Sequence, residues 1–223
     1  MNNESIAQTS VTNSVTVNPI AAIRSCGVNR AQRDAVRETW LPSIPFYYRF
    51  FSEEQTSEAD VVRVHCPSGR DMLTRKTHEI YRWCLENTKF THLFLVNDTA
   101  YVAGERLLGS GFDQHEYTGS MQFDLNYWTC WIDDTAMWLS RRAVQIIVSD
   151  GRLAQVERGD CDVVTADILR GRVKFHPDMR YIVRRSGGPD PLPGNEQLVS
   201  KVHTPEAIRF LHQAFQRDFH KPI

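Results

Sequence analysis

The chain has 223 residues, of which 24% are charged and 41% hydrophobic, and its net charge is −1. This length is enough for one substantial core, so we expect a single domain over residues 14–223 behind a polar lead over residues 1–13. The balanced charge excludes a strongly basic nucleic-acid-binding protein and a disordered acidic chain.

The polar N-terminal stretch has neither the basic nor the apolar region of a signal peptide. No apolar run approaches the roughly 18 residues that a membrane-spanning helix needs. The five cysteines are widely separated and never form a Cys-X-X-Cys pair, which disfavours a disulfide framework or a zinc site. We therefore expect a reduced, cytoplasmic protein without a membrane anchor. Its oligomeric state is not indicated.

Strands alternate with helices in the first half of the sequence. The predicted elements are a strand ending near Arg24, a helix over residues 30–39 with Asn29 as its N-cap, strands over residues 45–51 and 60–66, a helix over residues 68–87 and a strand over residues 91–96. The last strand is a continuous apolar run, which is typical of a strand buried on both faces of a largely parallel sheet. This order predicts an α/β fold with a mostly parallel central sheet flanked by helices.

The second half is less regular. Its predicted elements are strands over residues 116–123 and 135–140, a helix over residues 141–150 capped by Ser140, a helix over residues 161–171, short strands near residues 173–177 and 180–183, and a terminal helix over residues 204–219. A Gly/Pro-rich loop over residues 184–197 could close over a ligand. We find no internal repeat.

Asp98 directly follows the buried strand in the stretch HLFLVNDTAYV. In an open α/β sheet, ligands bind at the carboxyl ends of the strands, so Asp98 is well placed to contact one. The alternative is that Asp98 only begins an Asx-turn.

Six short motifs follow one another between residues 15 and 215. They are RAQRDAVRETW at 30–40, DMLTRKT at 71–77, NDTAYV at 97–102, TAMWLSRRAV at 135–144, GDCDVVTADIL at 159–169 and LVSKVHTPEAI at 198–208. In this order and spacing they resemble the motifs of the β-1,3-galactosyltransferase and Fringe-type glycosyltransferases. The resemblance implies a GT-A, Rossmann-like domain that transfers a hexose or pentose from a nucleotide sugar, expected to be a UDP-sugar, with inversion.

The resemblance also implies a donor site. Its residues would be Arg24, Ser25, Arg37, Lys76, Asn97, Asp98 and Thr99. A divalent cation, Mn²⁺ or Mg²⁺, would stabilise the leaving diphosphate, with Asp98 and His203 as protein ligands. Without the resemblance, Arg37 would be interpreted as a solvated helix residue and His203 as a surface histidine.

Four further carboxylates are candidates for the chemistry. Inverting transfer needs a general base that accepts the proton of the acceptor hydroxyl, and the resemblance places this role on Asp162, with Asp160 as the second choice. Alternatively, both carboxylates could only stabilise the N-terminus of a helix through its macrodipole. Asp133 and Asp134 form a pair that could face the donor or the acceptor, and we assign Asp134 to the donor site. The alternative for this pair is an ordinary turn.

The sequence departs from the family motif at two points. Thr99 replaces the third aspartate, usually the main metal contact, and Asn97 replaces the first. Metal binding should therefore be weaker, differently arranged or dispensable. The segment over residues 134–136 replaces glycines of the family, which leaves the shape of the sugar site open.

The acceptor is the least constrained part of the prediction. Between residues 169 and 186 the chain has five more basic than acidic residues, a segment that could bind phosphate backbones. Fringe-like enzymes also modify hydroxymethylated pyrimidines of phage DNA, and a flipped base needs aromatic surfaces. The acceptor-binding candidates are Trp128, Trp131, Arg184 and Arg185, with a core role as the alternative for the aromatic residues. DNA is the leading acceptor.

Three alternatives remain open at this level. The chain could glycosylate a protein or glycan, or it could be a catalytically degenerate module that only binds sugar nucleotides. The same carboxylates could also serve a metal-dependent nuclease or nucleotidyltransferase, in which case the ordered motifs would be coincidental.

Overall fold

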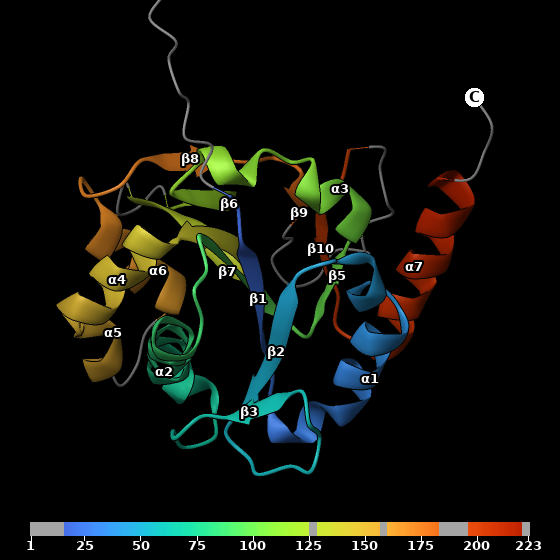
Figure 1. Ribbon diagram of the computed structural model, residues 1–223, viewed down its shortest axis with the longest axis horizontal. Helices are drawn as coiled ribbons and strands as arrows, with labels where there is room; N and C mark the ends of the chain where they lie inside the picture. Colours follow the sequence, from blue (N-terminus) through green and yellow to red (C-terminus); the bar gives the residue numbers. More distant parts are fainter. Residues whose placement is uncertain (1–15, 125–128, 157–159, 183–195, 220–223) are drawn as a thin grey trace, which may run out of the picture.

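A computed structural model describes residues 16–124, 129–156, 160–182 and 196–219. Through its middle runs a seven-stranded sheet in the order β3-β2-β1-β4-β7-β6-β8 (Figure 1). Its strands are β1 (Pro19–Arg24), β2 (Tyr47–Ser52), β3 (Val61–Arg63), β4 (His92–Asn97), β6 (Tyr117–Asp124), β7 (Thr129–Ser140) and β8 (Phe175–Pro177). Only β7 runs antiparallel to its neighbours β4 and β6, and the other pairs are parallel. The expected α/β class with a mostly parallel sheet is confirmed.

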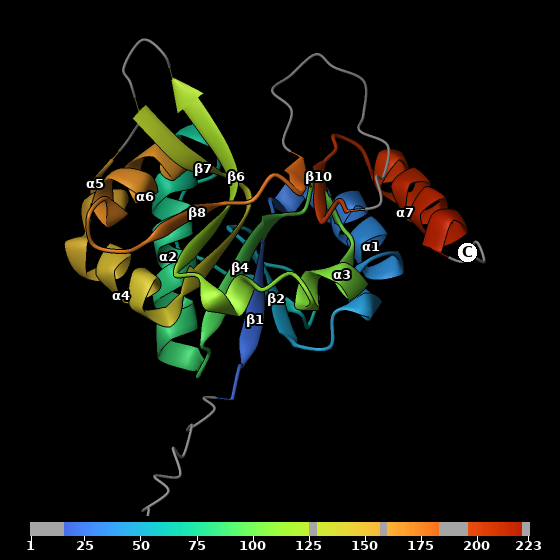
Figure 2. The same ribbon diagram turned by 90° about the horizontal axis from the view of Figure 1, so that it is seen from above.

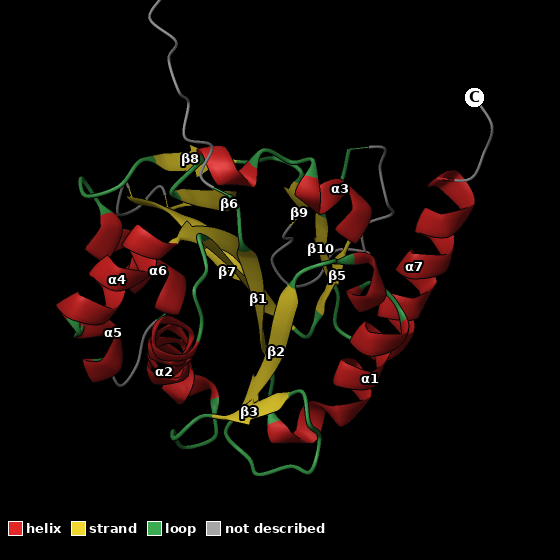
Figure 3. Ribbon diagram, in the orientation of Figure 1, coloured by secondary structure: helices red, strands yellow, loops and turns green. Residues whose placement is uncertain are grey.

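Helices cover both faces of this sheet. They are α1 (Arg30–Glu38), α2 (Leu73–Asn87), α3 (Gly104–Leu108), α4 (Arg141–Asp150), α5 (Arg152–Gln155), α6 (Cys161–Leu169) and α7 (Pro205–Phe219). One-turn 3₁₀ helices lie at Gly27–Asn29, Leu41–Ser43, Arg70–Met72 and Phe112–Gln114. Figure 3 shows α2, α4, α5 and α6 gathered on one side and α1, α3 and α7 on the other. Within the described part of the chain, no helix combines the length and apolar character that crossing a membrane requires.

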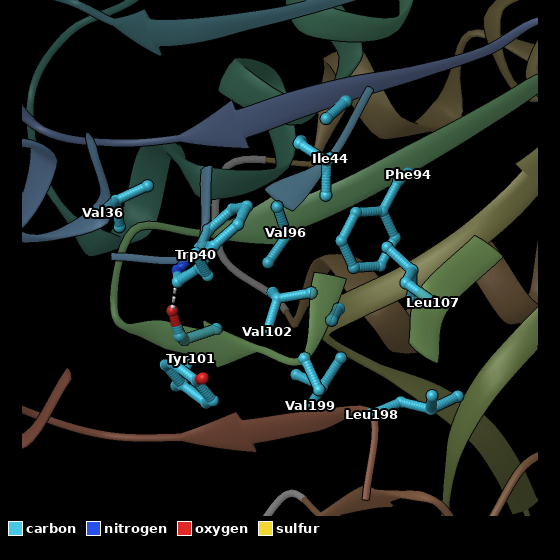
Figure 4. Packing of buried hydrophobic residues seen from close by; sticks show 14 of the residues in the cluster. Val36, Trp40, Ile44, Phe94, Val96, Tyr101, Val102, Leu107, Leu198 and Val199 are labelled. Carbon is cyan, nitrogen blue, oxygen red and sulfur yellow. Dashed lines mark hydrogen bonds between the residues drawn. The ribbon is translucent and has the colours of Figure 1, made fainter. Parts of the chain in front are cut away.

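Burial on both faces explains the continuous apolar run of β4. Phe94 and Val96 belong to one hydrophobic cluster, whereas Leu93 and Leu95 belong to the other, as the two-residue period of a strand requires. Figure 4 shows the first cluster, where the Trp40 Nε1 donates a hydrogen bond of 3.0 Å to the carbonyl of Ala100. The two clusters fix β4 at the centre of the molecule, with its carboxyl end open.

A second, three-stranded sheet continues from that open end. It has the order β5-β10-β9, formed by β5 (Ala100–Val102), β10 (Val199–Lys201) and β9 (Tyr181–Ile182). β5 and β10 are antiparallel with Lys201 opposite Ala100, and the amide of Val202 donates to the carbonyl of Thr99 over 2.8 Å. His203 follows Val202 directly and lines the same cavity as Asp98. A late segment of the chain is thereby brought to the tip of β4.

Most predicted elements are present, with instructive differences. Ser140 caps α4 as predicted, its Oγ accepting from the amide of Ala143 at 3.1 Å. The strand expected over residues 135–140 begins earlier, at Thr129, because β7 forms a hairpin with β6, seen extending from the sheet in Figure 2. Asp133 and Asp134 interrupt the apolar pattern of β7, so periodicity alone missed its first part. The polar lead over residues 1–13 lies outside the described residues.

Candidate functional site

A cavity of about 1040 Å³ opens at the carboxyl ends of β1 and β4, between the second sheet and the N-terminus of α6. This is the edge at which α/β sheets bind ligands. The candidate residues that line it are Arg24, Ser25, Lys76, Asn97, Asp98, Thr99, Trp131, Asp134, Asp160, Asp162 and His203. The fold thus brings residues from six separate segments of the chain to one polar cavity.

Asp98 lies at the tip of β4 and is only 3% exposed. The side-chain amide of Asn29 donates to both carboxylate oxygens, over 3.3 and 3.1 Å. Burial raises the pKa of Asp98, and hydrogen bonds from Ser25 and Asn29 offset this only in part. Within the described residues Asp98 makes no ion pair, so it is a buried carboxylate held mainly by neutral donors.

The role of Asn29 differs from its prediction. It occupies the N-cap position of α1, but its side chain makes no capping hydrogen bond. The amide is used instead by Asp98, which is 69 residues away in sequence. Because its sequence context is that of an N-cap, Asn29 was not identified as a residue of the site.

Arg24 is buried, and it is the centre of a hydrogen-bond network at the end of β1. All five of its N–H donors face protein acceptors. These acceptors are Asn97 Oδ1 at 2.8 Å, Thr77 Oγ1 at 2.9 Å, Cys161 Sγ at 3.1 Å, the Asp134 carbonyl at 3.0 Å and the Asp134 carboxylate at 2.8 Å. Although Arg24 lines the cavity, its hydrogen bonds hold β4, β7, α2 and α6 and leave no donor for a ligand.

The Arg24 partner Asp134 is also held by a second donor. The Cys161 thiol donates to Asp134 Oδ2 over 2.6 Å. Burial opposes ionisation of Asp134, but the charge of Arg24 and the thiol hydrogen bond keep the pKa of Asp134 below its ordinary value. Burial and the nearby Asp134 charge raise the pKa of the Cys161 thiol well above its usual range.

Lys76 and Arg33 both form hydrogen bonds to the loop that follows β1. The Lys76 ammonium contacts the Ser25 carbonyl and the Glu53 carboxylate, and it is almost fully buried. Arg33, which sequence reasoning did not single out, donates to Ser25 Oγ over 3.0 Å and to the Cys26 carbonyl over 2.7 Å. Both cations therefore shape the wall of the cavity through the main chain.

Arg37 does not line the cavity, although it was expected in the donor site. Its guanidinium pairs with Asp34, Glu58 and Asp60 at 2.7 to 2.9 Å. Burial lowers the pKa of Arg37, but the hydrogen bonds that its guanidinium donates to Asp60 and Glu58 raise it above its ordinary value. The structure places Arg37 in an ion-pair network between α1 and the segment before β3.

Asp162 lies in the first turn of α6, where it faces the cavity and is 8% exposed. Burial and the negative charges of Asp134 and Asp133 raise the pKa of Asp162 to about 7. A carboxyl group with such a pKa is about half ionised at neutral pH, and its ionised form is basic enough to accept a proton. Asp160, at the N-cap of the same helix, is exposed and makes no side-chain capping bond.

Two cations of the cavity were missed by sequence reasoning. Lys201 on β10 and Arg70 before α2 both line it, and neither makes an ion pair with another described residue. Lys201 acts electrostatically on Asp134, whose charge is already paired with Arg24. Lys201 is the half-buried last residue of β10, after two fully buried residues, and no motif of the sequence pointed to it.

The donor set for a metal ion is small. Asp98 and His203 offer a carboxylate and an imidazole, and among the described residues no three His, Cys, Asp or Glu side chains form a metal-binding group. Asp98 is nevertheless buried and forms no ion pair with any residue that the structure describes, a situation that a bound cation relieves. The two residues fit a weakly held cation whose other ligands come from solvent or a bound diphosphate.

The acceptor-binding candidates are only partly described. Trp131 is 7% exposed and lines the cavity. Trp128, Arg184 and Arg185 lie outside the described residues. The basic segment between residues 169 and 186 is partly neutralised, because each of its described arginines pairs with an aspartate. These pairs are Arg170 with Asp167, Arg172 with Asp150 and Arg180 with Asp178.

No protein-family model and no curated protein matches this sequence. One similar solved structure is a glycosyltransferase involved in the glycosylation of the major capsid of PBCV-1, with 10% identity, a TM-score of 0.48, and coverage of 72% of this chain and 82% of that one. The glycosyltransferase GlyE of Streptococcus pneumoniae TIGR4 has 6% identity, a TM-score of 0.48, and coverage of 73% and 45%. HddC from Yersinia pseudotuberculosis has 10% identity, a TM-score of 0.42, and coverage of 71% and 89%. These scores are too low to assign a family or a function.

Proposed function

We propose that the protein is an inverting glycosyltransferase that uses a nucleotide sugar, with a UDP-sugar as the first donor to test. The observation that carries this proposal is Asp162, a buried carboxylate with a pKa of about 7 that faces a cavity large enough for a sugar nucleotide. Its properties suit a general base for an attacking hydroxyl. The cavity edge also supplies two cations, Lys201 and Arg70, for the diphosphate of such a donor.

In this mechanism each group has a defined task. Asp162 accepts the proton of the acceptor hydroxyl as its oxygen attacks the anomeric carbon. Lys201 and Arg70, which are not ion-paired within the described chain, contact the leaving diphosphate. A divalent cation held by Asp98 and His203 would neutralise part of the charge that develops on this diphosphate. Lys76 acts indirectly, by fixing the Ser25 carbonyl.

The acceptor that we propose is a hydroxymethylated pyrimidine in DNA. Support comes from Trp131, an aromatic surface in the wall of the cavity on which a flipped base could stack. A protein or glycan hydroxyl is the alternative acceptor. A module that only binds sugar nucleotides would retain the cavity and lack turnover.

The function is tested by incubating the protein with a panel of UDP-, GDP- and dTDP-sugars and hydroxymethylated DNA, in the presence of Mn²⁺. Nucleoside mass spectrometry then detects an added hexose or pentose, while release of the nucleoside diphosphate reports turnover on any acceptor. We expect release of UDP. Release without a mass increase on DNA would redirect the search to proteins and glycans. Binding without any release would support the binding module.

Lys201→Ala should weaken UDP binding about tenfold, because a charge-assisted hydrogen bond to the diphosphate is lost. Isothermal titration calorimetry measures this dissociation constant. Lys174→Ala is the matched control, since Lys174 is a lysine outside the cavity. Equal UDP affinity in wild type and Lys201→Ala would exclude Lys201 from the donor site.

Asp98→Asn should abolish the effect of Mn²⁺ on the nucleotide complex. In the wild type, Mn²⁺ together with UDP should raise Tm by about 3 °C above UDP alone, because the ion binds the folded protein. Differential scanning fluorimetry compares the two variants and the control Asp113→Asn, an exposed carboxylate outside the cavity. If Mn²⁺ stabilises Asp98→Asn as strongly as the wild type, Asp98 is not a ligand.

A further inference from the structure

The N-terminus of α6 is fastened to β7 by a short chain of buried side chains. Cys161 is the first residue of the helix, and its thiol donates a hydrogen bond to Asp134 Oδ2 over 2.6 Å. Arg24 forms an ion pair with the same carboxylate over 2.8 Å. Cys161 is fully buried and Arg24 is 4% exposed. The adjacent residue in the chain is Asp162, the base of the proposed reaction.

This chain of contacts has two physical consequences for Asp162. Because Cys161 and Asp162 are neighbours in the first turn, anchoring the thiol also restrains the carboxylate that faces the cavity. Because Arg24 stabilises the ionised form of Asp134, a negative charge persists beside Asp162 over the whole neutral pH range. Neither effect requires Arg24 or Asp134 to touch the substrate.

We propose that Asp134, held by Arg24 and the Cys161 thiol, is a positioning residue that fixes the first turn of α6 and places a carboxylate beside Asp162. The proposal rests on the proposed function, because it assigns a partner to the base of that reaction. It also reassigns Asp134 and Arg24, which were expected to contact the donor directly. Their side chains are engaged with each other and with protein groups in the wall of the cavity.

The electrostatic part is tested with Asp134→Asn, which keeps an oxygen acceptor for Arg24 and the thiol but removes the charge. Carboxyl-carbon NMR of protein labelled with ¹³C-aspartate measures the titration of Asp162 directly. We expect the midpoint of this titration to shift about one unit towards lower pH. The acid limb of the plot of kcat/KM against pH should shift towards lower pH by the same amount. Asp167→Asn, on the exposed side of α6, is the control and should leave both unchanged.

The positional part is tested with the pair Cys161→Ala and Cys161→Ser. The serine hydroxyl can still donate to Asp134, whereas alanine cannot. Hydrogen exchange of the first-turn amides, Val163 to Thr165, should accelerate about tenfold or more in the alanine variant and stay close to wild type in the serine variant. Turnover should follow the same order, with kcat lowered about tenfold in the alanine variant and the donor KM unchanged.

The outcomes separate this inference from the proposed function. Unchanged titration of Asp162 in folded Asp134→Asn overturns the electrostatic role, and equal exchange in the two Cys161 variants overturns the positional role. Both measurements are independent of turnover. If both measurements give the expected changes but the wild type releases no nucleoside diphosphate from the donor panel, the proposed function fails. The contacts of Asp134 would then have a structural role and no catalytic one.

Discussion

Replacement of Asp162 by Asn lowers kcat about 100- to 10,000-fold, because general base catalysis typically contributes a factor of this size. The amide retains the shape of the carboxyl group but cannot accept the proton of the acceptor hydroxyl. The KM for the nucleotide sugar should change little, since Asp162 acts on the acceptor. Steady-state release of the nucleoside diphosphate measures both constants.

The pH dependence of turnover by the wild-type protein would test the same assignment without a mutation. A base must be deprotonated to act, and the pKa of Asp162 is raised to about 7 by burial and by its acidic neighbours. The rate should therefore fall about tenfold per pH unit below pH 7 and level off above it. A flat profile between pH 5 and 8 would contradict the assignment.

The free energy of unfolding should fall with rising pH, whereas the rate should increase. The pKa of Asp162 is higher in the folded than in the unfolded chain, so the folded state binds the proton more tightly. The stability that Asp162 contributes is fully present below its unfolded pKa and is lost as the pH rises through about 7. Asp162→Asn removes this loss and should be more stable than wild type at pH 8, on the order of 3 kcal/mol. An inactive but stabilised variant cannot be explained by misfolding.

The control for Asp162→Asn is Asp167→Asn on the same helix. Asp167 is an exposed partner of Arg152, so its loss should alter neither kcat nor the pH profile, and its stability effect should stay below about 1 kcal/mol. Equal activities of Asp162→Asn and Asp167→Asn would remove Asp162 from the mechanism. In that case Asp160, exposed at the start of α6, becomes the next carboxylate to test.

Arg24→Met destabilises the protein by about 3 to 5 kcal/mol, because it leaves the Asp134 carboxylate buried without its cationic partner. Methionine occupies a similar volume but can replace none of the five hydrogen bonds. Urea unfolding followed by circular dichroism measures the free energy difference.

The double variant Arg24→Met with Asp134→Asn separates the charge from the packing. Removing the stranded charge should recover about half of the lost stability, since the residual cost is that of unpaired neutral groups. Arg142→Met is the control. It breaks the exposed pair with Glu116 and should cost less than about 1 kcal/mol. A similarly small cost for Arg24→Met would mean that the network at the end of β1 is not structurally important.

The order of strands and helices could be predicted because it depends on local signals. The apolar run of β4 reflects burial on both faces, and the Ser140 cap and Gly151 bound α4 through contacts within a few residues. The position of Asp98 follows from the same reasoning, since the residue after a buried strand of an α/β sheet faces the ligand edge. These features require no knowledge of distant parts of the chain.

The pairing of polar side chains was decided only by the tertiary structure. Asn29 had the pattern of an N-cap, yet its amide binds Asp98, and Arg37 matched a donor-site motif, yet it pairs with three carboxylates away from the cavity. Lys201 reaches the cavity because β10 pairs with β5, two strands that are about a hundred residues apart. The sequence alone determined which residues end a buried strand. The ionisation and partners of those residues depend on desolvation and on charges from distant segments, which only the folded chain brings together.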